Sequence, residues 1–311
     1  MAGDRQGREP SPLRLLAIAV ILIGLVLAGL RLVPGSPFEA QAAATWGVGA
    51  GTGDGTRVDD AAGRSDRPSA EPSPSLPPLP FEAKELDLDI EGWYGWAILD
   101  RRTGEIIGSK DMSKTSTTAS LIKSWIIADY LRRADEKGQT PSDAKLADAT
   151  LVIRDSDNTR AEQFYNNVGR SASIKRAISM CGLTDSGVAP DGGWSRTALS
   201  PRDVARLGNC IAEGKAAGPE WTDWLLNEMR QVRGAGDFGI RKAFPAAERK
   251  QIAIKNGWID RTQEQEMHIN CLAIGDTWTM GVMVQYPIEL GYDYGMKNCQ
   301  KITEALLRPG V

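Results

Sequence analysis

The segment ASLIKSWIIADYL, residues 119–131, carries apolar side chains on nearly every side of a helix. Helices that are apolar all round are buried inside a domain. We therefore expect residues 119–131 to form a central, buried helix. Ser120 and Lys123 lie three positions apart on this segment, so their side chains would share one helix face.

The flanking segments predict a sheet that packs against helices. A block of helical stretches follows the central helix as far as about residue 230, and an amphipathic helix is expected at residues 297–307. The order of two strands, a helical block, three strands and a final helix predicts an α+β fold with an antiparallel sheet. The expected strands are residues 92–100, 105–109, 251–259, 267–275 and 277–286.

Composition excludes several classes of function. Lys and Arg total 37 and Asp and Glu total 40, for a net charge of −3, which lacks the basic excess of a nucleic-acid-binding protein. His268 is the sole histidine, which excludes a zinc site built on two or three histidines. The four cysteines form no C-x-x-C pair. We expect no metal and no cofactor, and catalysis by Ser, Lys, Asp or Glu.

The N-terminal region predicts export. Residues 15–30 are free of charged side chains and are flanked by Arg14 and Arg31. Such a run spans about 24 Å as a helix, and snorkelling arginines extend it towards the ~30 Å of a bilayer core. We expect residues 1–14 to be cytoplasmic and residues 15–33 to form a transmembrane signal anchor. A cleaved signal peptide, with its cleavage site at residues 40–42, is the alternative.

The chain beyond the apolar run divides into a linker and a folded domain. Residues 34–80 are rich in Gly, Ala, Ser, Asp and Pro and predict a disordered tether. Residues 81–311 form the expected domain. Both readings of the N-terminus place this domain outside the cytoplasm, where four spaced cysteines predict two disulfides. No cysteine lies near the apolar run, which excludes anchoring through a lipid-modified cysteine.

The candidate chemistry lies in three short motifs, SLIK at residues 120–123, SDN at 156–158 and KNG at 255–257. Burial of a lysine in an apolar helix lowers its pKa, and a neutral amine can accept the proton of a neighbouring serine and activate it as a nucleophile. Taken alone, Ser120 is more typical of a polar residue at a helix start than of a nucleophile. A second S-x-x-K match at residues 142–145 follows Pro141 in a polar stretch, where a serine is more typical of a helix cap.

The ordered motifs S-x-x-K, S-D-N and K-x-G resemble the signature of the active-site serine penicillin-recognising superfamily, in particular class A β-lactamases and D-alanyl-D-alanine peptidases. The segments SDNTRAE at 156–162 and SPRDVARL at 200–207 strengthen the resemblance, which covers residues 92–307. It implies a β-lactamase/transpeptidase-like fold with an additional all-helical subdomain. By resemblance and proximity, we expect the disulfides Cys181–Cys210 and Cys271–Cys299.

The resemblance also implies a role for each motif residue. Ser120 would be the nucleophile, Lys123 its base, and Ser156 a relay of the proton to the leaving nitrogen. The residues implied to bind the substrate are Asn158, Lys255, Asn256, Gly257 and Trp258. Of these, Asn158 would bind the amide side chain of the substrate, and Lys255 would bind its carboxylate. The backbone N–H groups of Ser120 and Trp258 would form the oxyanion hole.

Two departures from the family pattern concern the chemistry. Asn256 replaces a hydroxyl residue, although its amide can still donate a hydrogen bond. The loop at residues 181–200 contains no glutamate, and its carboxylates are limited to Asp185 and Asp191, so we expect the acyl-enzyme to hydrolyse slowly.

The sequence therefore predicts a membrane-anchored serine hydrolase that forms an acyl-enzyme with β-lactams or with D-Ala-terminated peptidoglycan stem peptides. A true class A-like β-lactamase and a non-catalytic cell-envelope binding module are the alternatives. Two other groups of residues have simpler explanations: Glu264, Glu266 and His268 are expected on a solvated face, and Trp221 and Trp224 in the core.

Overall fold

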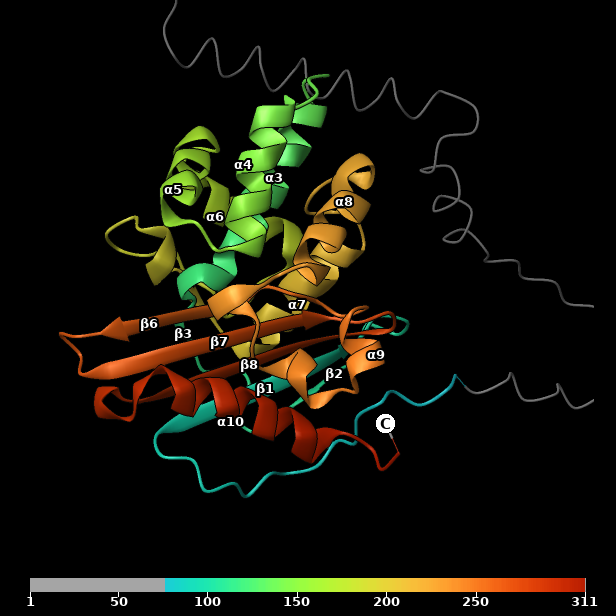
Figure 1. The fold of residues 1–311 in the computed structure, drawn as a ribbon, viewed down its shortest axis with the longest axis vertical. Helices are drawn as coiled ribbons and strands as arrows, with labels where there is room; N and C mark the ends of the chain where they lie inside the picture. Colours follow the sequence, from blue (N-terminus) through green and yellow to red (C-terminus); the bar gives the residue numbers. More distant parts are fainter. Residues whose placement is uncertain (1–75, 311) are drawn as a thin grey trace, which may run out of the picture. The chain divides into compact units, whose positions relative to one another are not determined.

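The computed structural model describes residues 76–310. The strands of this part are β1 (Trp93–Asp100), β2 (Ile106–Gly108), β3 (Ser116–Thr117), β4 (Ala198–Leu199), β5 (Ala253–Ile254), β6 (Gly257–Arg261), β7 (Glu266–Ile274) and β8 (Trp278–Pro287). Its α-helices are α3 (Lys123–Asp135), α4 (Asp143–Arg154), α5 (Asn158–Asn167), α6 (Ser171–Cys181), α7 (Pro201–Ala212), α8 (Pro219–Arg230), α9 (Ala246–Arg249) and α10 (Gly291–Leu306) (Figure 1). Short 3₁₀ turns include η1 (Ala119–Ile122), η2 (Trp194–Arg196) and η3 (Gly234–Gly236).

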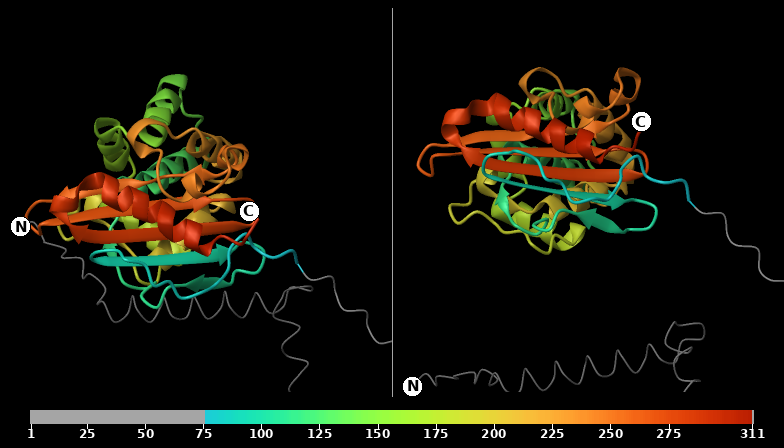
Figure 2. Two further views of the ribbon diagram at one scale, coloured as in Figure 1. Left: turned by 60° about the horizontal axis from the view of Figure 1, so that its bottom comes forward. Right: turned by 90° about the horizontal axis from the view of Figure 1, so that it is seen from below.

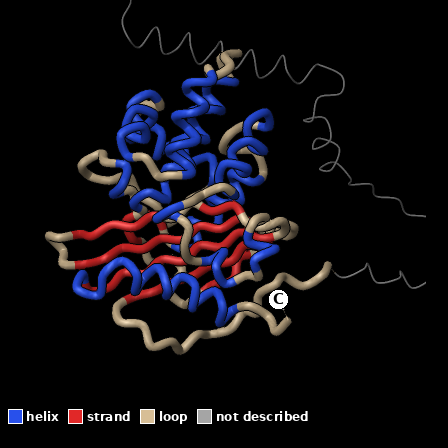
Figure 3. Tube along the Cα trace, viewed as in Figure 1, coloured by secondary structure: helices blue, strands red, loops and turns tan. Residues whose placement is uncertain are grey.

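The main sheet is antiparallel throughout, with strand order β2-β1-β8-β7 and with β5 and β6 both paired to β7. The two short strands keep one register along β7, because Ile254 lies opposite Ala273 and Gly257 opposite Asn270. They therefore act as a single edge strand that is interrupted at residues 255–256. Figure 3 shows this sheet as a layer between helical segments.

Helices cover both faces of the sheet. The C-terminal helix α10 packs against β7 and β8 on one face, and α7 packs against β1, β7 and β8 on the other (Figure 2). Helices α3, α4, α5, α6 and α8 form a cluster beyond α7 (Figure 1). The expected antiparallel sheet, final helix and helical block are therefore confirmed.

The segment at residues 119–131 is the buried centre that its composition predicts. Leu121, Ile122 and Trp125 are fully buried, and the Trp125 indole N–H donates to Ser173 O at 3.0 Å. The first turn differs from the expectation, because residues 119–122 form the 3₁₀ turn η1 and α3 begins only at Lys123. Ser120 and Lys123 therefore belong to two consecutive elements rather than to one regular helix.

The expected disulfides are both present. Cys181–Cys210 joins the end of α6 to α7, and Cys271–Cys299 joins β7 to α10. Each bond ties together elements that are 29 or 28 positions apart in the chain. Ser142 also has its expected role, because it is the N-cap of α4 and accepts a hydrogen bond from the backbone N–H of Lys145.

The expectation of a solvated face at Glu264, Glu266 and His268 is wrong for the histidine. His268 is 6% exposed, and its Nδ1 lies 2.9 Å from Ser116 Oγ and 2.8 Å from Thr117 Oγ1. The reason is that β7 is covered on this side by β3, which brings two hydroxyl groups to the imidazole. Glu264 and Glu266 remain partly exposed. Trp221 and Trp224 on α8 are half-buried and pack against the core.

The expected signal anchor at residues 15–33 lies outside the described residues, as does most of the expected linker. Within residues 76–310, no helix has the length and apolar character needed to cross a membrane.

Candidate active site

The amine of Lys123 lies at the centre of a cluster formed by the three motifs at residues 120–123, 156–158 and 255–257. Lys123 is fully buried at the start of α3, and its Nζ donates to Ser156 O at 2.6 Å, to Ser156 Oγ at 3.2 Å and to Asn158 Oδ1 at 2.6 Å. Burial lowers the pKa of Lys123 to about 7, although the negative charge of Asp157 opposes the shift. At neutral pH a substantial fraction of this amine is therefore unprotonated and able to accept a proton.

Ser120 lies one turn before Lys123, in the 3₁₀ turn η1. Its side chain is 9% exposed, and in the described part of the chain no hydrogen bond occupies its hydroxyl. The preceding residue, Ala119, has a φ of +46°, a conformation that non-glycine residues rarely adopt. Such backbone strain concentrates at functional sites, where the surrounding structure holds it in place.

The SDN motif connects α4 to α5 and places Ser156 between two lysines. Ser156 has a φ of +60°, and Asp157 caps α5 by accepting from the backbone N–H of Arg160 at 2.7 Å. Lys255 is fully buried, and its Nζ donates to Ser156 Oγ at 2.9 Å. Burial, reinforced by the positive charge of Lys123, moves the pKa of Lys255 well below the usual value for lysine. One serine hydroxyl is thus linked to two amines.

The edge strand places its backbone against Ser120. A Cβ atom built on Gly257 would lie 2.1 Å from Thr118 O, 2.6 Å from Leu121 N and 2.8 Å from Ser120 N. Only glycine allows this approach, because real Cβ atoms are not found so close to backbone atoms. The approach brings the start of β6, with Trp258 as its second residue, beside the backbone N–H of Ser120.

The side chain of Asn256 is directed away from this cluster. It is 1% exposed, and its Nδ2 donates to Gly236 O at 3.0 Å and to Phe238 O at 2.8 Å. Both amide hydrogens are therefore used to fix the turn around η3. The expected hydrogen bond from Asn256 to a substrate is not available in this arrangement, and the sequence could not show this because the acceptors are backbone atoms of a distant loop.

The loop between α6 and α7, called the 182–200 loop from its residues, carries two aspartates. Both are bound to groups outside the motif cluster. Asp185 accepts from Arg202 Nη2 at 2.6 Å and from Ser200 Oγ at 2.7 Å. Although burial opposes it, these hydrogen bonds lower the pKa of Asp185. Asp191 is 58% exposed and pairs with Arg196 at 3.7 Å. Among the described residues, neither carboxylate bonds to Ser120 or Lys123.

The loop instead presents Trp194 to the cluster. Lys123 Nζ lies 4.9 Å from the centre of the Trp194 ring, and the indole N–H donates to Glu162 Oε2 at 2.9 Å. Neither residue is among the site residues predicted from the sequence. The available signal was weak: one large aromatic residue, in the otherwise small and polar segment SGVAPDGGWSRT at residues 186–197.

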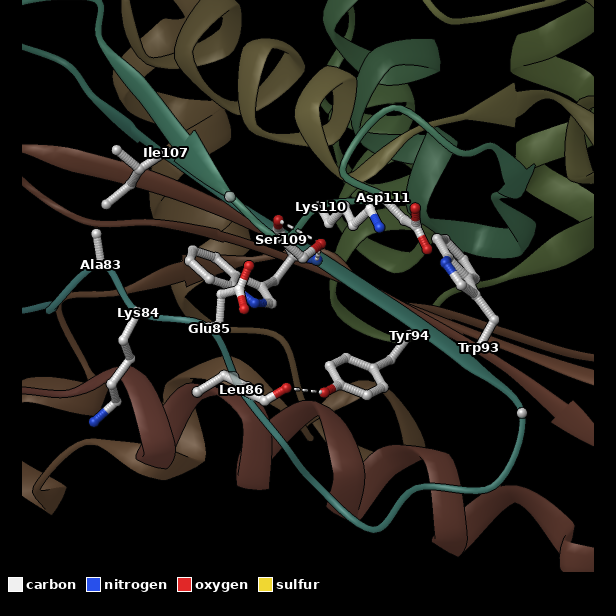
Figure 4. A pocket seen from close by; sticks show the side chains of 13 residues that line it. Ala83, Lys84, Glu85, Leu86, Trp93, Tyr94, Ile107, Ser109, Lys110 and Asp111 are labelled. Carbon is white, nitrogen blue, oxygen red and sulfur yellow. Dashed lines mark hydrogen bonds between the residues drawn. The ribbon is translucent and has the colours of Figure 1, made fainter.

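A cavity of about 850 Å³ lies elsewhere, between residues 83–86 and the strands β1 and β2. Trp93, Ser109 and Lys110 are among the residues that line it, and on its wall Tyr94 donates its hydroxyl proton to Leu86 O at 2.8 Å (Figure 4). No residue of the three motifs lines this cavity in the described part of the chain. The candidate site is therefore defined by the motif cluster and not by the cavity.

A family model named Beta-lactamase2, described as the β-lactamase enzyme family, matches residues 142–308. The chain belongs to the β-lactamase enzyme family. The match includes the SDN and KNG motifs and begins after Lys123, so the Ser120–Lys123 pair rests on the geometry described above. A curated relative from Mycobacterium tuberculosis (strain ATCC 25618 / H37Rv), named "Putative lipoprotein LppW", is 25% identical over 218 residues, which cover 67% of this chain and 68% of that protein.

Solved structures agree on the fold. The TLA-3 extended-spectrum β-lactamase aligns with a TM-score of 0.59 at 15% identity and covers 71% of this chain and 95% of its own. A class A β-lactamase from Mycobacterium abscessus aligns with a TM-score of 0.54 at 16% identity and covers 70% of this chain and 93% of its own. This chain therefore has the fold of class A β-lactamases.

Proposed function

We propose that this β-lactamase-family protein is a serine hydrolase that forms an acyl-enzyme at Ser120 and hydrolyses it slowly. The observation that carries the proposal is the convergence of two buried amines on Ser156 beside an unbonded serine hydroxyl. Two lysines are costly to bury without function, because each must be desolvated and neutralised or paired. The proposed substrates are β-lactams or D-Ala-terminated peptidoglycan stem peptides.

The first step of acylation is the attack of Ser120 on the substrate. Neutral Lys123 Nζ accepts the proton of Ser120, and Ser120 Oγ bonds to the carbonyl carbon of the substrate. The N–H groups of Ser120 and Trp258 donate to the resulting oxyanion, a contribution that is typically worth about 3–4 kcal/mol for each donor. In the free protein Lys123 bonds to the SDN motif instead of Ser120, and such contacts commonly tighten only when substrate binds.

The second step of acylation releases the leaving nitrogen. As the carbonyl C–N bond breaks, Ser156 Oγ gives its proton to the nitrogen and takes one from the Lys123 ammonium, which lies 3.2 Å away. Lys123 thereby returns to its neutral form. Lys255 orients the Ser156 hydroxyl from the other side at 2.9 Å and supplies positive charge for a substrate carboxylate when it is protonated. Asn158 would hold the amide side chain of the substrate.

Hydrolysis of the ester at Ser120 requires a base for the attacking water. The carboxylates of the 182–200 loop bind Arg202, Ser200 and Arg196 instead. General-base catalysis is typically worth 10²–10⁴-fold. Without it, the acyl-enzyme is expected to accumulate, as in a penicillin-binding peptidase.

We also propose that the domain is displayed outside the cytoplasm and tethered by residues 15–33. Two disulfides support an oxidising compartment. The name of the M. tuberculosis relative assigns a lipid anchor to that protein. Fractionation of cells that express the full chain would test the tether: recovery in the membrane fraction is expected, and recovery in the culture medium would support a cleaved signal instead.

Labelling with a fluorescent penicillin, followed by intact-protein mass spectrometry, tests the acyl-enzyme. We expect one covalent adduct on the wild-type protein and none on Ser120→Ala. Ser142→Ala is a matched control, because Ser142 begins the other S-x-x-K sequence but serves as the N-cap of α4. An adduct that persists in Ser120→Ala contradicts the assignment, and a wild-type protein that takes no label would favour the non-catalytic binding module.

A further inference from the structure

Trp194 is the loop residue that faces the catalytic amine. Its ring centre lies 4.9 Å from Lys123 Nζ, whose hydrogen bonds within the described part of the chain all go to the SDN motif. The indole N–H donates to Glu162 Oε2 at 2.9 Å, which fixes the ring. Glu162 is itself held by Arg170, whose Nη1 donates to Oε1 at 2.6 Å.

The loop that carries Trp194 is fixed on both sides of the ring. Before it, Tyr165 donates its hydroxyl proton to Gly192 O at 3.1 Å. After it, Arg261 Nη2 donates to Ser195 O at 2.8 Å, and the N–H of Thr118 donates to Thr197 O at 2.9 Å. The ring therefore has a defined position that is tied to α5, to β6 and to the residue two before Ser120.

We propose that Trp194 is a positioning residue that closes the Lys123 amine off from water on the side of the 182–200 loop. This inference rests on the proposed function, since it concerns the amine that is assigned as the base. In this role the 182–200 loop shields the amine of Lys123 from water, which requires no carboxylate. Lys123 is fully buried, whereas Trp194 is only half-buried and Asn158 is exposed, so the ring forms one part of the boundary between this amine and solvent.

The Trp194 ring has two opposing effects on the pKa of Lys123. The ring face attracts a cation, which is worth about 0.5–2 kcal/mol and favours the ammonium form. The same ring excludes water, and the loss of hydration costs a buried ammonium several kcal/mol. The second effect is larger, in line with a pKa of about 7 for Lys123 that is caused first by burial.

The other charged groups around the amine do not change on removal of the ring. Asp157 on the α4–α5 connection raises the pKa of Lys123. Lys255 on the edge strand opposes a second positive charge nearby, and Glu162 lies behind the indole. A Trp194→Ala variant leaves all three in place and lets water reach the amine. Its pKa is therefore expected to rise.

The direct test is an NMR titration of the folded protein with ¹³C-labelled lysine, in which the Lys123 signal is assigned from its loss in Lys123→Arg. We expect the midpoint of Lys123 to rise by about one pH unit in Trp194→Ala, which lowers the neutral fraction about tenfold below the midpoint. Trp194→Phe keeps an aromatic face and should shift the midpoint in the same direction by less. Trp224→Ala removes a half-buried indole on α8 and should cause no shift.

An unchanged or lowered Lys123 midpoint in Trp194→Ala overturns the proposal. If that variant does not fold, Trp194→Phe decides instead, because it keeps an aromatic ring and changes no charge near Lys123. It should raise the midpoint by less than the alanine variant, and no rise would overturn the proposal in the same way. The titration needs no substrate, so it remains decisive even if fluorescent penicillin fails to label Ser120, a result that would instead contradict the proposed function.

Discussion

Lys255 Nζ lies 2.9 Å from Ser156 Oγ, the same hydroxyl oxygen that Lys123 Nζ reaches at 3.2 Å. Two ammonium groups that share one buried hydroxyl repel each other, so the pair favours states in which at least one amine is neutral. Burial lowers the pKa of both lysines. In the proposed mechanism, neutral Lys123 would therefore accept the proton of Ser120, and Ser156 would donate one to the leaving nitrogen.

The rate of acylation is expected to rise with pH through a midpoint of about 7. Lys123 is charged and unable to accept a proton below its pKa of about 7, and it is neutral and competent above it. The measurement is the rate of fluorescent penicillin labelling between pH 5 and pH 9. Lys123→Arg keeps the charge but cannot deprotonate, so labelling should fall to background at every pH. A flat profile in the wild-type protein would show that Lys123 is not the base.

Gly257→Ala should abolish rapid acylation while the domain still folds. The added Cβ would lie within 2.8 Å of Thr118 O, Leu121 N and Ser120 N, so β6 must move away from η1. Loss of one oxyanion-hole donor typically lowers the rate by about 10²–10³-fold, and a comparable drop in labelling rate is expected. Gly187→Ala is the control, because open space surrounds that position on the 182–200 loop. Equal labelling rates in the two variants would contradict the proposed oxyanion hole.

The two disulfides should differ in their response to a reductant. Cys271 and Cys299 are fully buried, whereas Cys181 is partly exposed at the end of α6. Mild reduction of the native protein should therefore open Cys181–Cys210 first, as measured by alkylation and peptide mapping. Replacement of either pair by serine is expected to cost about 3–4 kcal/mol of unfolding free energy in the chain-entropy model, or a Tm loss of about 6–16 °C. Preferential alkylation of Cys271 would contradict this order.

The sequence predicted the parts of the fold and site that depend on local pattern. The apolar segment at residues 119–131 marked the central helix, and the strand runs marked β1, β7 and β8 to within one or two residues. The disulfide pairing followed from the family resemblance, since three pairings of four cysteines are possible.

Features that depend on contacts between distant segments could not be predicted. His268 is buried because β3 covers that part of β7, and Asn256 turns away because carbonyl groups around η3 accept its amide hydrogens. The indole of Trp194, beside Lys123, is fixed by Glu162, 32 positions earlier in the chain. In each case the decisive partner lies far along the chain and carries no sequence signal of its own.

Slow hydrolysis of the acyl-enzyme is the final prediction, and it concerns Asp185 and Asp191. Asp185 is bound to Arg202 and Ser200 at the start of α7, and its lowered pKa makes it a weak base. Asp191 is bound to the N–H of Gly193 at 2.8 Å and is largely exposed. Neither group is placed to deprotonate a water at Ser120. We therefore expect a stoichiometric burst with nitrocefin, followed by little steady-state turnover.

The two asparagine variants separate a structural from a catalytic role for these carboxylates. Asp185→Asn should lower the Tm, because it replaces an ion pair and a charge-assisted hydrogen bond, yet it should leave the slow turnover unchanged. Asp191→Asn, at an exposed position, should change neither quantity. Sustained nitrocefin turnover on the order of 10 s⁻¹, a typical enzymatic rate, would favour a true β-lactamase. Loss of that turnover in one variant would identify its carboxylate as the base, since the loop would then have to bring that group to the ester during the reaction.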